Sequence, residues 1–268
     1  MTSGQQVSFN VPVRDSYLAA ILDLPTSSAI DKEYPVVITC HGFTSGKNGP
    51  SWLKISDCLT KRGIACVRFD FSGHYDSPGN VGDLTFAQGT EDLKAVVDHL
   101  DQFNQIDRTK IGLYGSSYAT PITFRYIAEF NNVIVLALKA PRIDLCKAYR
   151  DRLGEKAIQA WRDTGVHVRE KGDDSIKMSY EIYADAERHD IYETAKHIDI
   201  PTYIAHGTAD QSCPFDQTEK LADIMGDNLT LDVFEGGDHG FTRPGDHNKV
   251  TSRSASFLAK YLLSDNNQ

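Results

Sequence analysis

The sequence predicts an α/β architecture with a mostly parallel sheet of eight strands and helices on both faces. Short apolar runs rich in β-branched residues alternate with segments of helical periodicity, which is the pattern of βαβ units. The runs are apolar almost throughout, as expected of parallel strands that are buried on both sides. Functional groups gather at the carboxyl ends of such strands, so catalytic residues are expected just after a strand.

The expected elements follow one another in order along the chain. A β-hairpin opens it, with strands at 7–13 and 17–25 around the turn Arg14-Asp15-Ser16. Further strands are expected at 35–40, 64–71, 110–115, 133–141, 202–207 and 229–236. Helices are expected at 52–63, 85–103, 121–130 and 250–263, and the second places Leu93, Val96, Val97 and Leu100 on one face.

One stretch, residues 142–197, breaks this alternation. It is polar, highly charged and mostly helical in pattern, without a clear strand, and it is far longer than a βα connection needs. A disordered loop would not carry so many large apolar side chains, which are Leu153, Ile158, Trp161, Ile176, Met178, Tyr180, Ile182 and Tyr183. We therefore expect a helical cap inserted into a single domain that spans residues 1–268.

Composition excludes several classes of function. The formal net charge of −9 disfavours nucleic acid or an anionic membrane as a partner. No apolar stretch is long enough to span a bilayer, and the N-terminus lacks the pattern of a secretory signal. Five cysteines, an odd number without a CxxC pair, favour reduced thiols and hence the cytoplasm.

The segment KIGLYGSSYAT holds the candidate nucleophile. A serine at a sharp strand-to-helix turn, with small residues two positions before and after it, is typical of a nucleophile elbow. Ser117 satisfies this spacing with Gly115 and Ala119, although the second small residue is usually glycine. Ser116 is the alternative, but it would place Tyr114 and Tyr118 at the crowded positions, so Ser117 is preferred.

A serine hydroxyl needs a base to take its proton and a carboxylate to orient that base. Asp210 follows the strand at 202–207, and His239 lies in a glycine-rich loop after the strand at 229–236, so the chain order is serine, acid, histidine. Two other carboxylates are nearby. Asp238 would point away from its neighbour His239, and Asp216 suits the start of the next helix.

Other polar residues receive supporting roles. The backbone N–H groups of Phe43 and Tyr118 are candidates for the oxyanion hole, since one follows a strand and the other follows Ser117. His74 is expected to shape one wall of the site. Candidates for the substrate pocket are His41, Trp161, Tyr180 and Tyr183.

No metal or cofactor is expected. The segments HVREKGDD and AERHD lack the spacing of a zinc site. The sequence also has no G-x-G-x-x-G and no P-loop, so no nucleotide cofactor is predicted.

Together, the segments HGF, FDFSGH, GSSYA, HGTAD and GGDHGF resemble the α/β-hydrolase superfamily over nearly the whole chain. Within it, the stretch DIYETAKHIDIPTYIAHGTAD followed by FEGGDHGF looks most like bacterial cinnamoyl or feruloyl esterases. The resemblance implies Ser117 as nucleophile, Asp210 as acid and His239 as base, with Phe43 and Tyr118 donating to the oxyanion. Related dienelactone hydrolases use a cysteine nucleophile, and the serine here argues against that mechanism.

Two departures bear on the substrate. The family loop reads G-H-G-x-S, whereas this chain has GHYDS at 73–77, and GSSYA looks closer to prolyl-oligopeptidase-like serine hydrolases.

We therefore expect cleavage of small carboxylic esters, with an acylaminoacyl- or iminopeptidase-like activity as the alternative. A non-catalytic binding protein on the same scaffold is a third possibility, which an intact triad disfavours. We expect a monomer or a homodimer.

Overall fold

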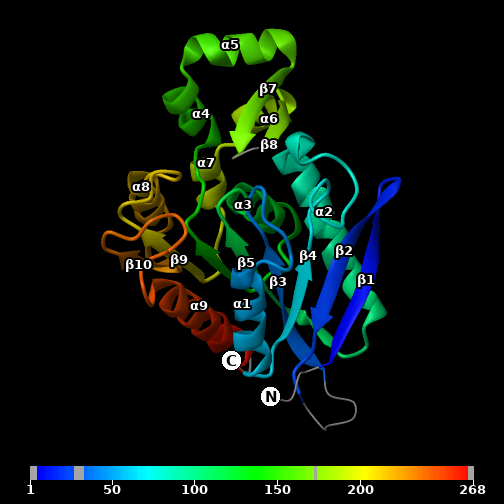
Figure 1. Cartoon of the computed structure of the whole chain (residues 1–268). Coiled ribbons are helices and arrows are strands. Elements are labelled where there is room, and N and C mark those ends of the chain that lie inside the picture. Colours follow the sequence, from blue (N-terminus) through cyan, green and yellow to red (C-terminus); the bar gives the residue numbers. More distant parts are fainter. Residues whose placement is uncertain (1–4, 27–32, 172–173, 265–268) are drawn as a thin grey trace.

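The computed structural model describes residues 5–26, 33–171 and 174–264 (Figure 1). Its main sheet consists of β1 (Gln6–Val13), β2 (Ser16–Asp23), β3 (Tyr34–Cys40), β4 (Ala65–Phe69), β5 (Ile106–Ser116), β6 (Val135–Lys139), β9 (Thr202–Gly207) and β10 (Leu229–Phe234). The strand order is β1-β2-β4-β3-β5-β6-β9-β10. From β4 to β10 all pairings are parallel, and the hairpin β1–β2 joins antiparallel at one edge. The predicted α/β-hydrolase sheet is therefore confirmed.

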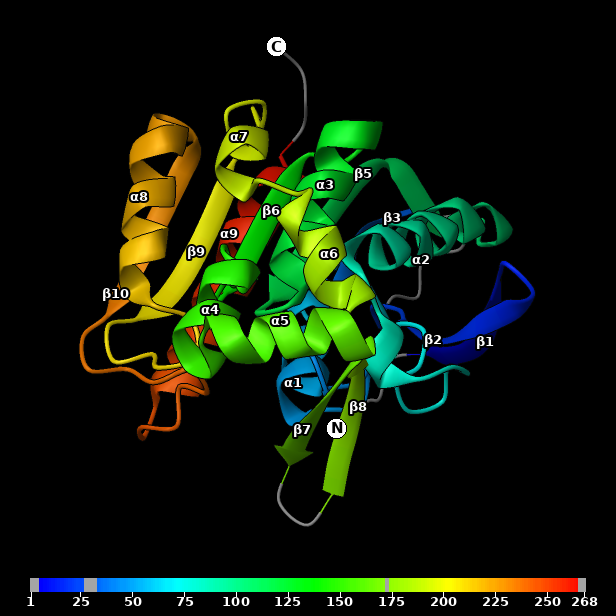
Figure 2. The ribbon, with the colours of Figure 1, turned by 90° about the horizontal axis from the view of Figure 1, so that it is seen from above.

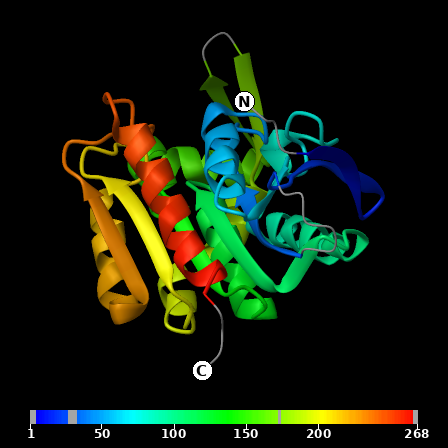
Figure 3. The same ribbon diagram turned by 90° about the horizontal axis from the view of Figure 1, so that it is seen from below.

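Helices cover both faces of this sheet. On one face lie α1 (Pro50–Thr60) and α9 (Asp246–Leu262), which pack against each other (Figure 3). The other face carries α2 (Phe86–His99), α3 (Ala119–Phe130) and α8 (Phe215–Met225), whose apolar residues belong to a separate buried cluster. Short 3₁₀ turns lie at Val81–Asp83, Leu100–Gln102 and Gly226–Asn228.

Element boundaries differ from the prediction by a few residues. Strand β5 begins at Ile106, because a register irregularity opposite Tyr34 and Val36 lets pairing extend back from the expected start. Helix α3 begins at Ala119, so Pro121 lies inside the first turn. Proline is tolerated there because the first N–H groups of a helix have no intrahelical partner anyway.

The segment between β6 and β9 contains more than helices. Beyond α4 (Leu145–Leu153) and α5 (Glu155–Thr164) it forms a two-stranded antiparallel hairpin of β7 (Val166–Lys171) and β8 (Asp174–Ser179). Short helices α6 (Glu181–Glu187) and α7 (Ile191–Ala195) follow. The prediction of no strand in this stretch was wrong. VHV and SIKMS alternate apolar and polar residues with period two, but the charged residues around them made this pattern hard to recognise in the sequence.

Residues 142–197 are called the cap segment from here on. Helices α4 and α5 and the hairpin β7–β8 lie toward the carboxyl ends of the strands, whereas α7 packs against α3 and α8 near the start of β9 (Figure 2). The interior of the cap segment is built around Trp161, which is buried and donates its indole N–H to Met178 O at 2.9 Å. Tyr149 and Tyr183 pack on the same indole ring. These side chains belong to the buried cluster that continues under α2 and α3, so one core joins the cap segment to the sheet.

A glycine at the end of β9 lets the loop after β10 approach closely. A Cβ on Gly207 would lie 2.2 Å from Gly237 O, in the loop that carries His239. We predict that Gly207→Ala lowers the free energy of unfolding by about 1–3 kcal/mol, because backbone atoms must move apart.

Urea denaturation measures this loss, with Gly63→Ala as the control. Gly63, unlike Gly207, has a positive φ, of +85°, and no atom lies within 4 Å of the added carbon. Its substitution reports backbone strain alone, of about 1 kcal/mol. Equal losses in the two variants would contradict the close approach.

Candidate active site

Ser117 occupies the sharp turn between β5 and α3. Its φ is +51°, a left-handed conformation that is uncommon for any residue except glycine. Around it, small residues are needed: a Cβ on Gly42 would lie 3.3 Å from Ser117 Cβ, and Ala119 is completely buried. This is the geometry expected of a nucleophile elbow.

Asp210 lies just after β9 with its side chain fully buried. Its Oδ2 accepts hydrogen bonds from His239 Nδ1 at 2.7 Å and from His206 Nε2 at 3.2 Å. Its Oδ1 accepts from the amides of Ser212 and Cys213, both at 2.8 Å. Burial by itself raises the pKa of Asp210, but the hydrogen bonds from both histidines and Cys213 outweigh it and hold the pKa well below its ordinary value.

His239 is the more accessible partner, with 34% of its side chain exposed. Burial lowers the pKa of its imidazole, but the bond to Asp210 and the neighbouring Cys213 outweigh this and raise the pKa to about 9. Because Nδ1 donates to the carboxylate, Nε2 is the nitrogen left to act as a base.

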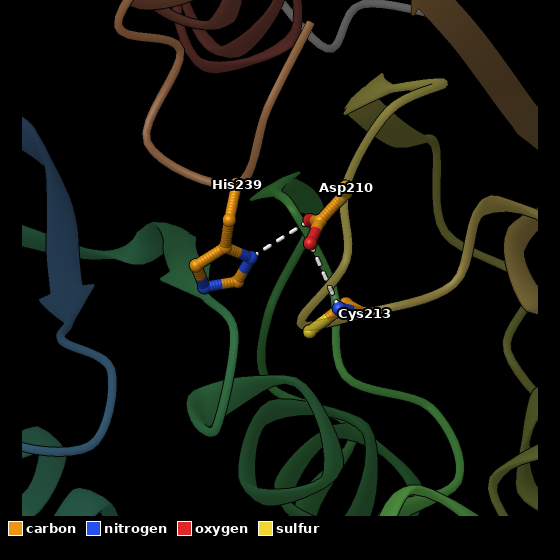
Figure 4. A group of neighbouring side chains, drawn as sticks. All are labelled: Asp210, Cys213 and His239. Carbon is orange, nitrogen blue, oxygen red and sulfur yellow. Dashed lines mark hydrogen bonds and ion pairs between the residues drawn. The ribbon is translucent and has the colours of Figure 1, made fainter.

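Ser117 Oγ is turned toward Cys213 Sγ, at 3.9 Å. Among the described residues it makes no hydrogen bond to His239, although both side chains line the same cavity. Figure 4 shows Asp210 flanked by His239 and Cys213. Hydrogen bonds between catalytic residues are often long or poorly aligned when no substrate is bound. For Ser117 to donate to His239, the serine side chain would have to rotate away from Cys213.

Asp210, Cys213 and His239 offer ligand atoms that all lie within 4.8 Å of one another. That spacing suits a metal ion, but both oxygens of Asp210 already accept two hydrogen bonds each. A metal would have to displace these donors, so the arrangement fits a hydrogen-bonded acid better than a metal ligand.

Phe43 and Tyr118 both line the cavity, and their rings lie 5.3 Å apart. In the described part of the chain, the backbone N–H of neither residue donates to a protein acceptor. The loop carrying Phe43 is anchored by Lys47, whose backbone N and Nζ both lie 2.6 Å from the buried carboxylate of Asp70. Two free donors on a fixed backbone suit an oxyanion hole.

His41 and His74 support this loop from behind. His41 donates from Nδ1 to Gly42 O and accepts from the Phe71 amide at Nε2, and burial lowers its pKa to about 3. His74 is buried against the rings of His41 and Phe43. Both histidines shape the loop rather than contact the cavity.

The cavity has a volume of about 540 Å³. Ser117, Tyr118, His239 and Phe43 lie on the sheet side, and the cap segment contributes Leu145, Tyr149, Arg152 and Arg169. The prediction that His41, Trp161, Tyr180 and Tyr183 line the pocket was wrong. His41 bonds to backbone behind the loop, and the three aromatic residues pack together within the cap segment.

Comparison with known proteins is consistent with this geometry. The profile of the prolyl oligopeptidase family matches residues 80–265, which include Ser117, Asp210 and His239. The chain belongs to the prolyl oligopeptidase family. A second α/β-hydrolase profile, that of X-Pro dipeptidyl-peptidases, matches residues 17–123.

Several individual proteins are also similar to this chain. It is 39% identical over 256 residues to the non-heme chloroperoxidase CPO-A1 of Kitasatospora aureofaciens, covering 84% of this chain and 92% of that one. It is 25% identical over 219 residues to the mitochondrial palmitoyl-protein thioesterase ABHD10 of Bos taurus, covering 79% and 69%. The ferulic-acid-bound structure of Est1E from Butyrivibrio proteoclasticus shares the fold, with a TM-score of 0.80, 19% identity and coverage of 96% and 100%.

Sequence reasoning missed two neighbours of Asp210. His206 is buried at the end of β9, where Nδ1 contacts Thr218 Oγ1 at 2.7 Å. Cys213 lies in the turn after Asp210, beside Ser117. The pattern H-G-x-x-D could have predicted the role of His206. A tight turn after the strand brings the aspartate carboxylate close to the histidine four residues earlier. No pattern in the sequence marked Cys213.

The hydrogen bond to Asp210 makes a testable statement about His239. We predict that its imidazole titrates near pH 9, so that it is charged below that pH and neutral above it. Cys213→Ala should lower the pKa, because the neighbouring sulfur helps to raise it. NMR titration of the imidazole measures both values, and His239→Gln assigns the signal. A wild-type pKa at or below 6.5 would contradict the described contact with Asp210.

Proposed function

We propose that this chain is a serine hydrolase that cleaves carboxylic esters, with Ser117, His239 and Asp210 as its catalytic triad. The observation that carries the proposal is the bond between buried Asp210 and His239 Nδ1, beside a serine held at positive φ in the same cavity. The three side chains come from separate loops at the carboxyl ends of β5, β9 and β10. A structural role alone would not require this convergence.

The reaction would proceed through an acyl-enzyme. Ser117 Oγ attacks the ester carbonyl while its proton passes to Nε2 of the neutral form of His239, which is the form that can act as a base. The bond to the leaving alcohol then breaks, and the alkoxide takes the same proton from the imidazole. Water attacks the acyl-enzyme with His239 again acting as base, which releases the acid and restores the serine. Asp210 stays ionised and stabilises the imidazolium in both steps.

The negative charge on the attacked carbonyl oxygen requires preformed donors. We assign this role to the backbone N–H groups of Phe43 and Tyr118, which are free of protein acceptors among the described residues. Losing one such donor typically costs about 3–4 kcal/mol of transition-state stabilisation. We also propose that the cap segment closes over the cavity as part of a single domain, because it contributes both lining residues and core.

Two of the similar proteins support acyl transfer but differ in substrate. ABHD10 is a palmitoyl-protein thioesterase, and Est1E was solved with ferulic acid. The family match to prolyl oligopeptidases favours a second candidate, hydrolysis of small peptide amides on the same residues.

We place the protein in a reducing compartment such as the cytoplasm, since all five cysteines are free thiols. Within the described residues, no helix has the length and apolar character needed to cross a membrane.

Replacing the nucleophile tests the proposal. We predict that Ser117→Ala lowers kcat/KM for 4-nitrophenyl butyrate by roughly 10⁴-fold or more, because no other group supplies the attacking oxygen. Ser116→Ala is the matched control. Its side chain lies at the end of β5 outside the cavity, so activity should stay within a few-fold of wild type. Both variants should unfold at the wild-type urea concentration. Retained activity in Ser117→Ala would refute the assignment.

The choice between ester and amide is tested with matched acyl groups. We predict that kcat/KM for a 4-nitrophenyl ester exceeds that for the corresponding 4-nitroanilide of an N-acetyl amino acid by at least about 10³-fold, since an amide is less reactive toward a serine nucleophile and an esterase need not bind a peptide main chain. Stopped assays of nitrophenol and nitroaniline release measure both rates. Comparable turnover of the anilide would favour the peptidase alternative.

A further inference from the structure

Three arginines converge on the cavity that holds Ser117. Arg142 follows β6, and its backbone N lies 3.2 Å from Ser117 O. Arg152 lies in α4 and Arg169 in β7, and all three line the cavity together with Ser117 and His239. One wall of the candidate active site is therefore a concentration of positive charge on a protein whose formal net charge is −9.

Most of the other arginines that the structure describes pair with an acid, as Arg68 does with Asp23, but these three do not. Within the described residues, no Asp or Glu oxygen lies within 4.0 Å of any of the three guanidinium groups. Arg142 Nη2 donates to Ser212 O at 2.9 Å. The other two lie over aromatic rings, Arg169 at 5.5 Å from the centre of Phe43 and Arg152 at 4.9 Å from that of Tyr149. Arg152 also hydrogen-bonds to Tyr149. Most of the remaining guanidinium N–H groups of the three arginines have no acceptor among the described residues.

The acid among the residues that line the cavity does not neutralise this wall. Asp151 also lines the cavity, but its carboxylate pairs with Lys147 on the outer side of α4. Burial lowers the pKa of Arg169, and the charges of Arg152 and Arg142 lower it further. Clustered, unpaired guanidinium groups beside a cavity repel one another, and binding an anion between them removes that repulsion.

We propose that the protein acts on esters that carry a carboxylate, which Arg142, Arg152 and Arg169 bind while Ser117 attacks the ester carbonyl. This inference rests on the proposed function and specifies its substrate class. Leu145 and Tyr149 lie among the arginines and provide apolar surface for a short carbon chain. A cavity of about 540 Å³ accommodates a small molecule of this kind.

Matched esters that differ only in charge test the proposal. The first pair is 4-nitrophenyl hydrogen adipate and its methyl ester, with the carboxylate on the acyl part. The second pair is 4-(butyryloxy)benzoate and its methyl ester, with the carboxylate on the leaving alcohol. In at least one pair, kcat/KM for the anion should exceed that for the neutral ester by roughly tenfold or more at low salt. The pair that shows the preference identifies which part of the ester faces the arginines.

Variants locate the source of the preference. Arg152→Gln and Arg169→Gln should each lower the ratio of anionic to neutral kcat/KM by about fivefold to tenfold. Arg169→Lys should retain part of the preference, because the charge remains but the paired donors of the guanidinium group are lost. The matched control is Arg162→Gln, which removes an equal charge from the cap segment. Arg162 pairs with Glu187 and does not line the cavity, so the ratio should stay at the wild-type value. Raising NaCl to about 0.5 M should reduce the wild-type preference without any substitution.

The outcomes separate this inference from the proposed function. Hydrolysis of both members of each pair at equal rates, lost in Ser117→Ala, would overturn the inference and leave the esterase proposal standing. Absence of all ester hydrolysis would overturn the esterase proposal, and calorimetric titration with adipate then decides the anion site. Adipate binding that weakens in Arg169→Gln but not in Arg162→Gln would support the site, and no binding to wild type would reject it.

Discussion

The buried carboxylate of Asp210 holds the site together. It accepts hydrogen bonds from His206 on β9, from His239 after β10, and from the amides of Ser212 and Cys213. An unpaired charge buried this deeply would be very costly, whereas each hydrogen bond to a charged group contributes about 1.5–3 kcal/mol. The turn after β9 and the orientation of the His239 ring are therefore set by one group.

Much of this arrangement could be predicted from the sequence, because functional residues in an α/β fold follow the strands of the sheet. Buried strands appear as apolar runs, and parallel strands bring their carboxyl ends to one edge, so residues that follow strands are expected to meet. That reasoning selected Asp210 over its neighbours. In the structure Asp238 accepts from the Thr242 amide, and Asp216 lies in the first turn of α8, as each local pattern indicated.

The cap segment could not be predicted in the same way, since its elements are short and highly charged. Its hairpin depends on Ile176 and Met178 finding buried positions, which is a tertiary effect. The aromatic residues expected in the pocket pack on one another instead, because Trp161 and Tyr183 bury more apolar area as a cap core than as a solvated lining. The arginines that line the cavity look like ordinary surface charge in the sequence, and only folding brings them together.

The central claim is that Ser117 is an activated nucleophile, and labelling with a fluorophosphonate tests it most directly. Such a probe reacts with a serine only when a neighbouring base and an oxyanion hole activate it. Our account predicts one adduct per chain, located at Ser117 by peptide mass spectrometry, and strongly slowed labelling in His239→Ala. A folded wild-type protein that remains unlabelled, or an adduct located on another residue, would contradict it.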